Sequence, residues 1–220
     1  MKALSLCIFF LFSLSILYSN ILINEVLVDP EGSDEGNEWI ELYNNSAETV
    51  NLTGWKIQSA GTSFTTNYTF PEISIQPDSF LLIAESNIPN AHLYANLSFQ
   101  NGGSASDGIR ITSPDGQWSD TIIYDSPNSN LLADDTGNTA TDFVPETECM
   151  KSFSRIQDGF DSNSSSDWTL SERLTPGKSN TDFIDIEISA CYVIKTGFSI
   201  NIHTIVHNLS TIPVDISTLC

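Results

Sequence analysis

A run of acidic residues near the start of the chain is the first feature that could do chemistry. Six carboxylates fall within thirteen residues: Asp29, Glu31, Asp34, Glu35, Glu38 and Glu41. Oxygen ligands on a loop beside a strand suit Ca²⁺, which many extracellular modules bind weakly. The stretch lacks the Asp-x-Asp-x-Asp-Gly order of a known calcium loop, and Gly32 and Gly36 also fit a solvated acidic turn. Ca²⁺ is therefore the one candidate cofactor, with a solvated loop as the structural alternative, and we assign no metal ligand.

Glu25 and Glu41 fall in predicted strands, where a pair of carboxylates could act as general acid and base. No nucleophile and no row of sugar-binding aromatic residues lies beside them in the sequence. We expect these carboxylates to accept hydrogen bonds from backbone amides, or from the indoles of Trp39 and Trp55, where strands meet. Their predicted role is structural.

The histidines and one glycine-flanked serine give no catalytic set. His203 and His207 share a strand face, but at ~3.3 Å per residue they lie about 13 Å apart, too far to share a metal. His92 is predicted to be a surface residue. Ser104 follows Gly102-Gly103 without a Gly-x-Ser-x-Gly elbow, so a turn is the simpler interpretation. The sequence therefore predicts a chain that is not an enzyme.

The elements that would position these residues are short strands. Apolar runs alternate with turn residues at the spacing typical of an all-β sandwich, and no long helix is predicted. We predict strands over residues 21–28, 38–43, 49–57, 64–70, 80–84, 108–112, 119–124 and 151–156. The Ser113-Pro114-Asp115-Gly116 turn should place Ile109 and Ile111 opposite the region of Ile122 and Tyr124.

Strand 38–43 carries apolar residues on both faces, which favours a central position with one face on the core and the other under a loop. Residues 125–148 are rich in Asp, Asn, Thr and Pro and predict a long, mobile loop. Residues 158–180 are rich in Ser, Asp and Gly. We expect Trp168 and Leu170 to pin this irregular segment onto the sandwich.

The two ends of the chain differ from its centre. Residues 1–19 have the apolar run of a secretory signal peptide. A Pro- and Gly-containing linker at 175–180 precedes alternating apolar residues, which predict that residues 183–220 hold the first strands of a second, incomplete β-sandwich. Cleavage of the leader would leave Cys149, Cys191 and Cys220, an odd number whose spacing fits no zinc site and whose disulfide state stays open.

The charge balance excludes two classes of partner. The 220 residues hold 28 acidic and 8 basic side chains, a formal charge of −20, and 24 of the acidic residues lie between Glu25 and Glu172. Such a surface repels phosphate backbones and anionic bilayers, so we expect no nucleic-acid partner and no membrane contact beyond the leader.

Three motifs carry a family resemblance: Asn-Glu-Trp-Ile-Glu-Leu-Tyr-Asn at 37–44, Val-Asn-Leu-Thr-Gly-Trp-Lys-Ile at 50–57, and Thr-Pro-Gly at 175–177. Residues 21–180 resemble the lamin tail domain as it occurs in exported bacterial proteins. The resemblance implies an immunoglobulin-like β-sandwich without catalytic residues.

The sequence thus predicts a non-catalytic structural or interaction module of a larger secreted or cell-surface protein, with a protein or a surface polymer as partner. An alternative is the accessory N-terminal domain of a secreted hydrolase, such as a nuclease, whose catalytic domain would follow Cys220. A weaker alternative is a carbohydrate-binding module that uses Trp39, Trp55, Trp118 or Trp168.

Overall fold

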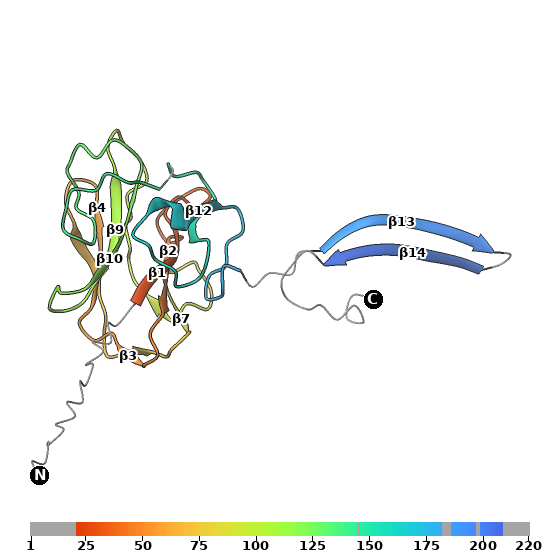
Figure 1. Cartoon of the computed structure of the whole chain (residues 1–220), viewed down its shortest axis with the longest axis horizontal. Helices are drawn as coiled ribbons and strands as arrows, with labels where there is room; N and C mark the ends of the chain where they lie inside the picture. Colours follow the sequence, from red (N-terminus) through yellow and green to blue (C-terminus); the bar gives the residue numbers. More distant parts are fainter. Residues whose placement is uncertain (1–20, 145, 182–185, 197–198, 209–220) are drawn as a thin grey trace, which may run out of the picture.

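Two largely antiparallel sheets packed face to face form the body of the protein, as drawn in Figure 1. The computed structural model describes residues 21–144, 146–181, 186–196 and 199–208, with side chains described up to residue 181. The six-stranded sheet has the order β12-β11-β1-β2-β7-β8, and the four-stranded sheet has the order β10-β9-β4-β5. Among the strands that the structure describes, β7 and β8 are the one pair that runs in parallel. This is an immunoglobulin-like β-sandwich, as the sequence predicted.

The strands of the six-stranded sheet are β1 (Ile21–Leu27), β2 (Trp39–Asn44), β7 (Phe80–Ala84), β8 (Leu93–Tyr94), β11 (Ser152–Arg155) and β12 (Trp168–Ser171). Those of the four-stranded sheet are β4 (Lys56–Ala60), β5 (Thr65–Thr69), β9 (Asp107–Thr112) and β10 (Ser119–Tyr124). A small separate pair joins β3 (Val50–Asn51) to β6 (Ser74–Ile75). Among the described residues the helical structure is a single 3₁₀ turn, η1 (Ser165–Asp167).

The core lies between the two sheets because alternate residues of each strand point inward. In β2, Ile40 and Leu42 enter this main core, while Trp39 lies in a second cluster on the opposite face with Leu27 and Leu82. β2 has β1 on one side and β7 on the other. The predicted central position of this strand is therefore confirmed.

A β-bulge at Asn24 changes which side chains of β1 face the core. Ile23 lies opposite Leu42 in β2, whereas Glu25 lies opposite Glu41, so Asn24 is an extra residue in the ladder. Ile23 and Val26 both reach the main core on either side of the bulge. The bulge thereby moves Glu25 to the outer face, next to Glu41.

One predicted strand was wrong. Residues 49–57 do not form a continuous strand, because a turn separates β3 from β4. The amide of Trp55 donates to the carbonyl of Leu52 at 2.9 Å, and Gly54 has a φ of +79°, which residues with a Cβ rarely adopt. The apolar residues on both sides of Gly54 concealed the turn.

The β9–β10 hairpin agrees with the prediction. Ile109 lies opposite Ile122, and the turn holds Gly116 at a φ of +70°. The same register sets Asp120 opposite Ile111, on a strand whose neighbouring residues are apolar or hydroxylated. An acidic side chain is therefore carried into the buried part of the sandwich.

Two long irregular segments close around the sandwich. Residues 125–144 and 146–148 are irregular, as expected, but the segment is packed against the sheets rather than free, since Leu132, Ala140 and Val144 are buried. Trp168 is buried in the main core and Leu170 packs against it, as predicted, and both belong to β12 rather than to an irregular tail.

Beyond residue 185, β13 (Ile186–Thr196) and β14 (Ser199–Asn208) pair as an antiparallel hairpin. His203 and His207 lie opposite Tyr192 and Glu187 in its register. The predicted leader, at residues 1–19, and Cys220 lie outside the described residues. No helix among the described residues is long and apolar enough to cross a membrane.

Candidate functional site

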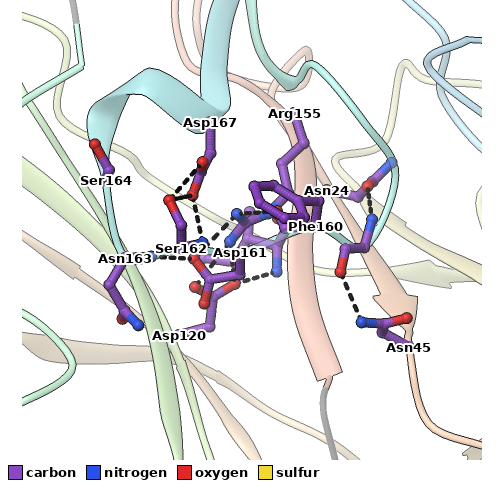
Figure 2. A network of polar contacts seen from close by, with 12 residues as sticks. Asn24, Asn45, Asp120, Arg155, Phe160, Asp161, Ser162, Asn163, Ser164 and Asp167 are labelled. Carbon is purple, nitrogen blue, oxygen red and sulfur yellow. Dashed lines mark hydrogen bonds and ion pairs between the residues drawn. The ribbon is translucent and has the colours of Figure 1, made fainter.

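Arg155, on β11, lies at the centre of the polar network drawn in Figure 2. Its side chain is 1% exposed, and each guanidinium nitrogen has a partner. Nη2 donates to both carboxylate oxygens of Asp120, at 3.0 and 3.1 Å, and Nη1 donates to Asp161 Oδ1 at 3.2 Å. The guanidinium also lies 4.4 Å from the ring centre of Trp168. The separate donors of the guanidinium thus let one arginine pair with two carboxylates at once.

The network also includes two backbone groups of β1 that have no partner in the ladder with β11. The ladder between β1 and β11 joins Glu25 to Ser154 and Val26 to Phe153, so Ile23 lies beyond it. The Ile23 amide donates to Asp120 at 2.6 Å, and the Ile23 carbonyl accepts from Arg155 Nε at 2.7 Å. Side chains from β10 and β11 thus replace the missing strand and join the two sheets.

A tight loop presents Asp161 to the arginine. The Asn163 amide donates to Asp161 Oδ1 at 3.0 Å, and the hydroxyl and amide of Ser162 donate to Asp167. Ser164 caps the following 3₁₀ turn by accepting from the Ser166 amide. These contacts restrict the backbone conformation of residues 161–167.

Asp135 supplies a third carboxylate from the other irregular segment. One oxygen from each of Asp120, Asp135 and Asp161 lies within 4.8 Å of the others. Asp135 Oδ1 is buried without a hydrogen-bond partner. Burial, and then the charge of Asp120, raise the pKa of Asp135 to about 8, against the opposing effect of Arg110.

The three aspartates are the group of described side chains whose spacing would suit a metal ion. Arg155 brings one positive charge to three carboxylates, so the ionised cluster keeps a surplus of negative charge. A proton on Asp135 or a cation shared by the three carboxylates would each reduce this surplus. Chemically, the cluster can store a proton or hold a hard cation.

A hollow of about 420 Å³ opens beside this cluster. Its walls come from the start of β10, from residues 135–136 and from residues 159–163. Its lining includes Asn45, Gln117, Trp118, Ser119, Asp135, Asp161 and Asn163. A second hollow of about 230 Å³ shares Asp135, Thr136, Asp161 and Asn163 with the first. The two hollows therefore adjoin along these residues.

The comparison with known families identifies the fold. The model of the Lamin Tail Domain matches residues 17–144, more than half of the chain. The chain belongs to the lamin tail domain family. A search of curated proteins found no match. The family match ends before β11, although β11 and β12 extend the same sheet as β1 and supply Arg155.

The acidic stretch that suggested Ca²⁺ is divided in this lamin tail domain. Glu31 and Glu35 are exposed, whereas Glu38 and Glu41 are buried on β2 or beside it. Glu38 accepts from the Phe99 amide at 2.9 Å, and burial raises its pKa to about 8. The stretch thus contributes to several separate contacts rather than to one convergent site.

Glu25 and Glu41 hold the segment that follows β12. Glu25 accepts from the hydroxyl of Ser152 at 2.6 Å and from the amide of Thr175 at 3.1 Å. Glu41 Oε2 accepts from the amides of Gly177 and Lys178, at 2.6 and 3.0 Å. Backbone amides are partners, as predicted, while the predicted indoles are not among the hydrogen-bond donors to these carboxylates.

The other residues singled out from the sequence are dispersed. His92 Nδ1 accepts from the Leu82 amide at 2.9 Å, and Ser104 is exposed in the loop before β9. Cys149 is exposed and free, while Cys191 lies on β13, whose side chains lie outside the described part. Nothing in the described structure brings these residues together.

The sequence reasoning missed Arg155, Asp120, Asp135 and Asp161. One signal was available, because Asp120 interrupts a β-strand that is otherwise suited to a core. Asp135 and Asp161 lie in irregular segments, and their meeting depends on contacts between residues far apart in sequence.

Proposed function

We propose that this lamin tail domain is a non-catalytic interaction module of an exported protein, acting outside the cytoplasm at or near the cell surface. The family is one of structural β-sandwich modules, which supports the non-catalytic part of the proposal. The observation on which the proposal rests is that the buried charged side chains hold parts of the fold together. Arg155 joins the two sheets, while Glu25 and Glu41 hold residues 175–178.

The apolar run at residues 3–18 and the acidic surface support export. A formal charge of −20 also favours a protein or a surface polymer over nucleic acid as the partner. The alternative of an accessory domain in a secreted hydrolase predicts the same export, and the described side chains add no support for it.

The test of export uses the whole chain in a bacterial host. We expect the protein in the periplasm or medium, with a mature N-terminus near Asn20 by mass spectrometry. Leu11→Arg, in the middle of the apolar run, should keep the chain in the cytoplasm with its N-terminus intact. Cytoplasmic retention of the unaltered chain would contradict the proposal.

One observation favours carbohydrate binding as a second function. Of the four tryptophans considered for it, Trp39, Trp55 and Trp168 are 1%, 6% and 8% exposed, so their rings are packed inside. Trp118 is only half-buried and lines the larger hollow. A ring in this position can contact a ligand.

A further inference from the structure

We propose that the larger hollow, beside Trp118, binds an uncharged saccharide unit of a cell-surface polymer. The inference rests on the proposed function, because it names the chemical class of the partner that the exported module would meet. It follows from the shape, the unused polar groups, the aromatic ring and the charge of the hollow.

The hollow has the size and the construction of a small-molecule site. Its volume of about 420 Å³ lies within the range of about 300–1,000 Å³ that is typical of ligand pockets. Three segments that are distant in sequence form most of its walls, Asn45 adds a further amide, and Leu22 adds an apolar patch. A sugar ring presents a similar mixture of hydroxyl groups and apolar C–H faces.

Polar side chains around the hollow are free to bind. Among the described residues, the side chains of Gln117, Ser119 and Asn163 form no hydrogen bond with another group, although the backbone amides of Gln117 and Asn163 do. Figure 2 shows the Asn163 amide pointing away from the arginine network. Two amides and one hydroxyl offer both donors and acceptors, which matches the vicinal hydroxyls of a saccharide.

Trp118 provides a rigid apolar surface at the same place. Its ring packs against that of Trp55, with ring centres 5.5 Å apart, and it borders the main core. An aromatic side chain held in this way loses little conformational entropy when a ligand binds. The C–H face of a sugar is the natural partner for such a ring.

The charge of the hollow selects against anionic ligands. Asp135 and Asp161 lie in its lining, and no Lys or Arg does. A phosphate, a sulfate or a uronic acid placed here would lose hydration water and find no cation in the lining to replace it. An uncharged saccharide avoids this cost and can donate hydroxyl protons to the carboxylates.

The walls are fixed before any ligand arrives. Asn45 Nδ2 donates to the Gly159 carbonyl at 2.7 Å, and the Gly159 amide donates to Asn24 Oδ1 at 3.2 Å. The arginine network holds Asp161. A preorganised hollow of this kind favours affinity because few groups must be ordered on binding.

The test is calorimetric and fluorescence titration of the full chain with soluble β-glucan, mannan and chitin oligosaccharides, with dextran sulfate as the anionic comparison. We expect saturable binding of at least one neutral oligosaccharide and none of dextran sulfate. Trp118→Ala should weaken that binding at least tenfold, and the double variant Q117A/N163A should weaken it several-fold. Asn96→Ala, an exposed amide outside the hollow, is the matched control and should leave binding unchanged.

Because Trp118→Ala also removes a contact with Trp55, the double variant keeps the test decisive if the single variant fails to fold. No binding of any neutral oligosaccharide, tighter binding of dextran sulfate, or binding that Q117A/N163A leaves unchanged would each overturn the inference. Export is measured separately. An exported chain that binds no saccharide would refute the inference alone, whereas a saccharide-binding chain retained in the cytoplasm would refute the proposed function.

Discussion

At the scale of single residues, Arg155 is the side chain on which most depends. It holds two carboxylates and two backbone carbonyls in a place almost without solvent. A buried ion pair adds little over a well-packed apolar pair, but removing one partner leaves an uncompensated charge inside the protein. The contribution of this network to stability is therefore best measured by removing one of its members.

Arg155→Met should lower the free energy of unfolding by about 3–5 kcal/mol, because Asp120 would remain buried without its cation. Urea denaturation followed by tryptophan fluorescence measures the change. Lys178→Met, at an exposed cation, should shift it by less than about 0.5 kcal/mol. Adding Asp120→Asn to Arg155→Met should recover part of the loss, and no recovery would argue against the ion pair as the cause.

Asp135 should make stability depend on pH. Its pKa is raised from 3.8 to about 8 by burial and by Asp120, so the folded state retains a proton that the unfolded chain releases. Stability from this group is complete below about pH 4 and is lost as pH rises through about 8. The Asp135 carboxyl group is also affected by the side chains of Asp161, Thr121 and Arg110.

Thermal unfolding between pH 5 and pH 9 checks this expectation. The melting temperature of the unaltered chain should fall as pH rises, and Asp135→Asn should make the decline shallower. Glu35→Gln, at an exposed carboxylate, should leave the slope as it is. An Asp135→Asn profile parallel to that of the unaltered chain would show that another group titrates.

At the scale of elements, turns set the shape of the site as much as strands do. The turn after β11 brings Gly159 against Tyr43, with a φ of +66°. A Cβ at this position would collide with the tyrosine ring, and an L-residue with this φ is strained as well. This turn therefore depends on glycine for two separate reasons.

Gly159→Ala should cost about 2 kcal/mol or more, since strain and overpacking add together. Gly137→Ala is the matched control, because Gly137 has a φ of +78° with open space around it and carries only the conformational cost. Chemical denaturation of both variants gives the difference. Equal losses would mean that the contact with Tyr43 relaxes freely.

Most of the strands could be predicted because alternation and turn residues are local signals. β7 and β10 match the predicted ranges, and the hairpin register followed from its Pro-Asp-Gly turn. The bulge at Asn24 also left a trace, since the inward apolar positions change from odd to even between Ile23 and Val26. The turn at Gly54 was missed because apolar residues flank it on both sides.

The candidate site could not be predicted in the same way. Asp135 and Asp161 belong to a site only because the fold places them next to Asp120. Neither residue lies in a repeating sequence pattern. The unused amides of Gln117 and Asn163 became visible only once three separate segments had been placed around one hollow.

At the scale of the whole molecule, the unit that folds should be longer than the family match. The match ends at residue 144, yet β11 pairs with β1 and supplies the cation for Asp120. Residues 175–178 then satisfy Glu25 and Glu41. A chain that stopped at residue 144 would leave three buried carboxylates without these partners.

Residues 21–181 should therefore unfold cooperatively, and residues 21–144 should not. Circular dichroism and tryptophan fluorescence during thermal unfolding would compare the two fragments. A fragment of residues 21–155, which restores Arg155 but not the contacts of Glu25 and Glu41 with residues 175–178, should be intermediate. A sharp transition of residues 21–144 near that of the longer fragment would refute this boundary.

The contact between Arg155 and Ile23 has a consequence for the order of events during synthesis, since it joins residues 132 positions apart. The first strand leaves the ribosome long before the strand that completes its edge. Contacts that close such large loops form slowly, because the chain must pay their entropy first. The sandwich can complete its folding only after β11 has emerged from the ribosome. A chain that stays unfolded until then would still be able to pass through a secretion channel, as the proposed export requires.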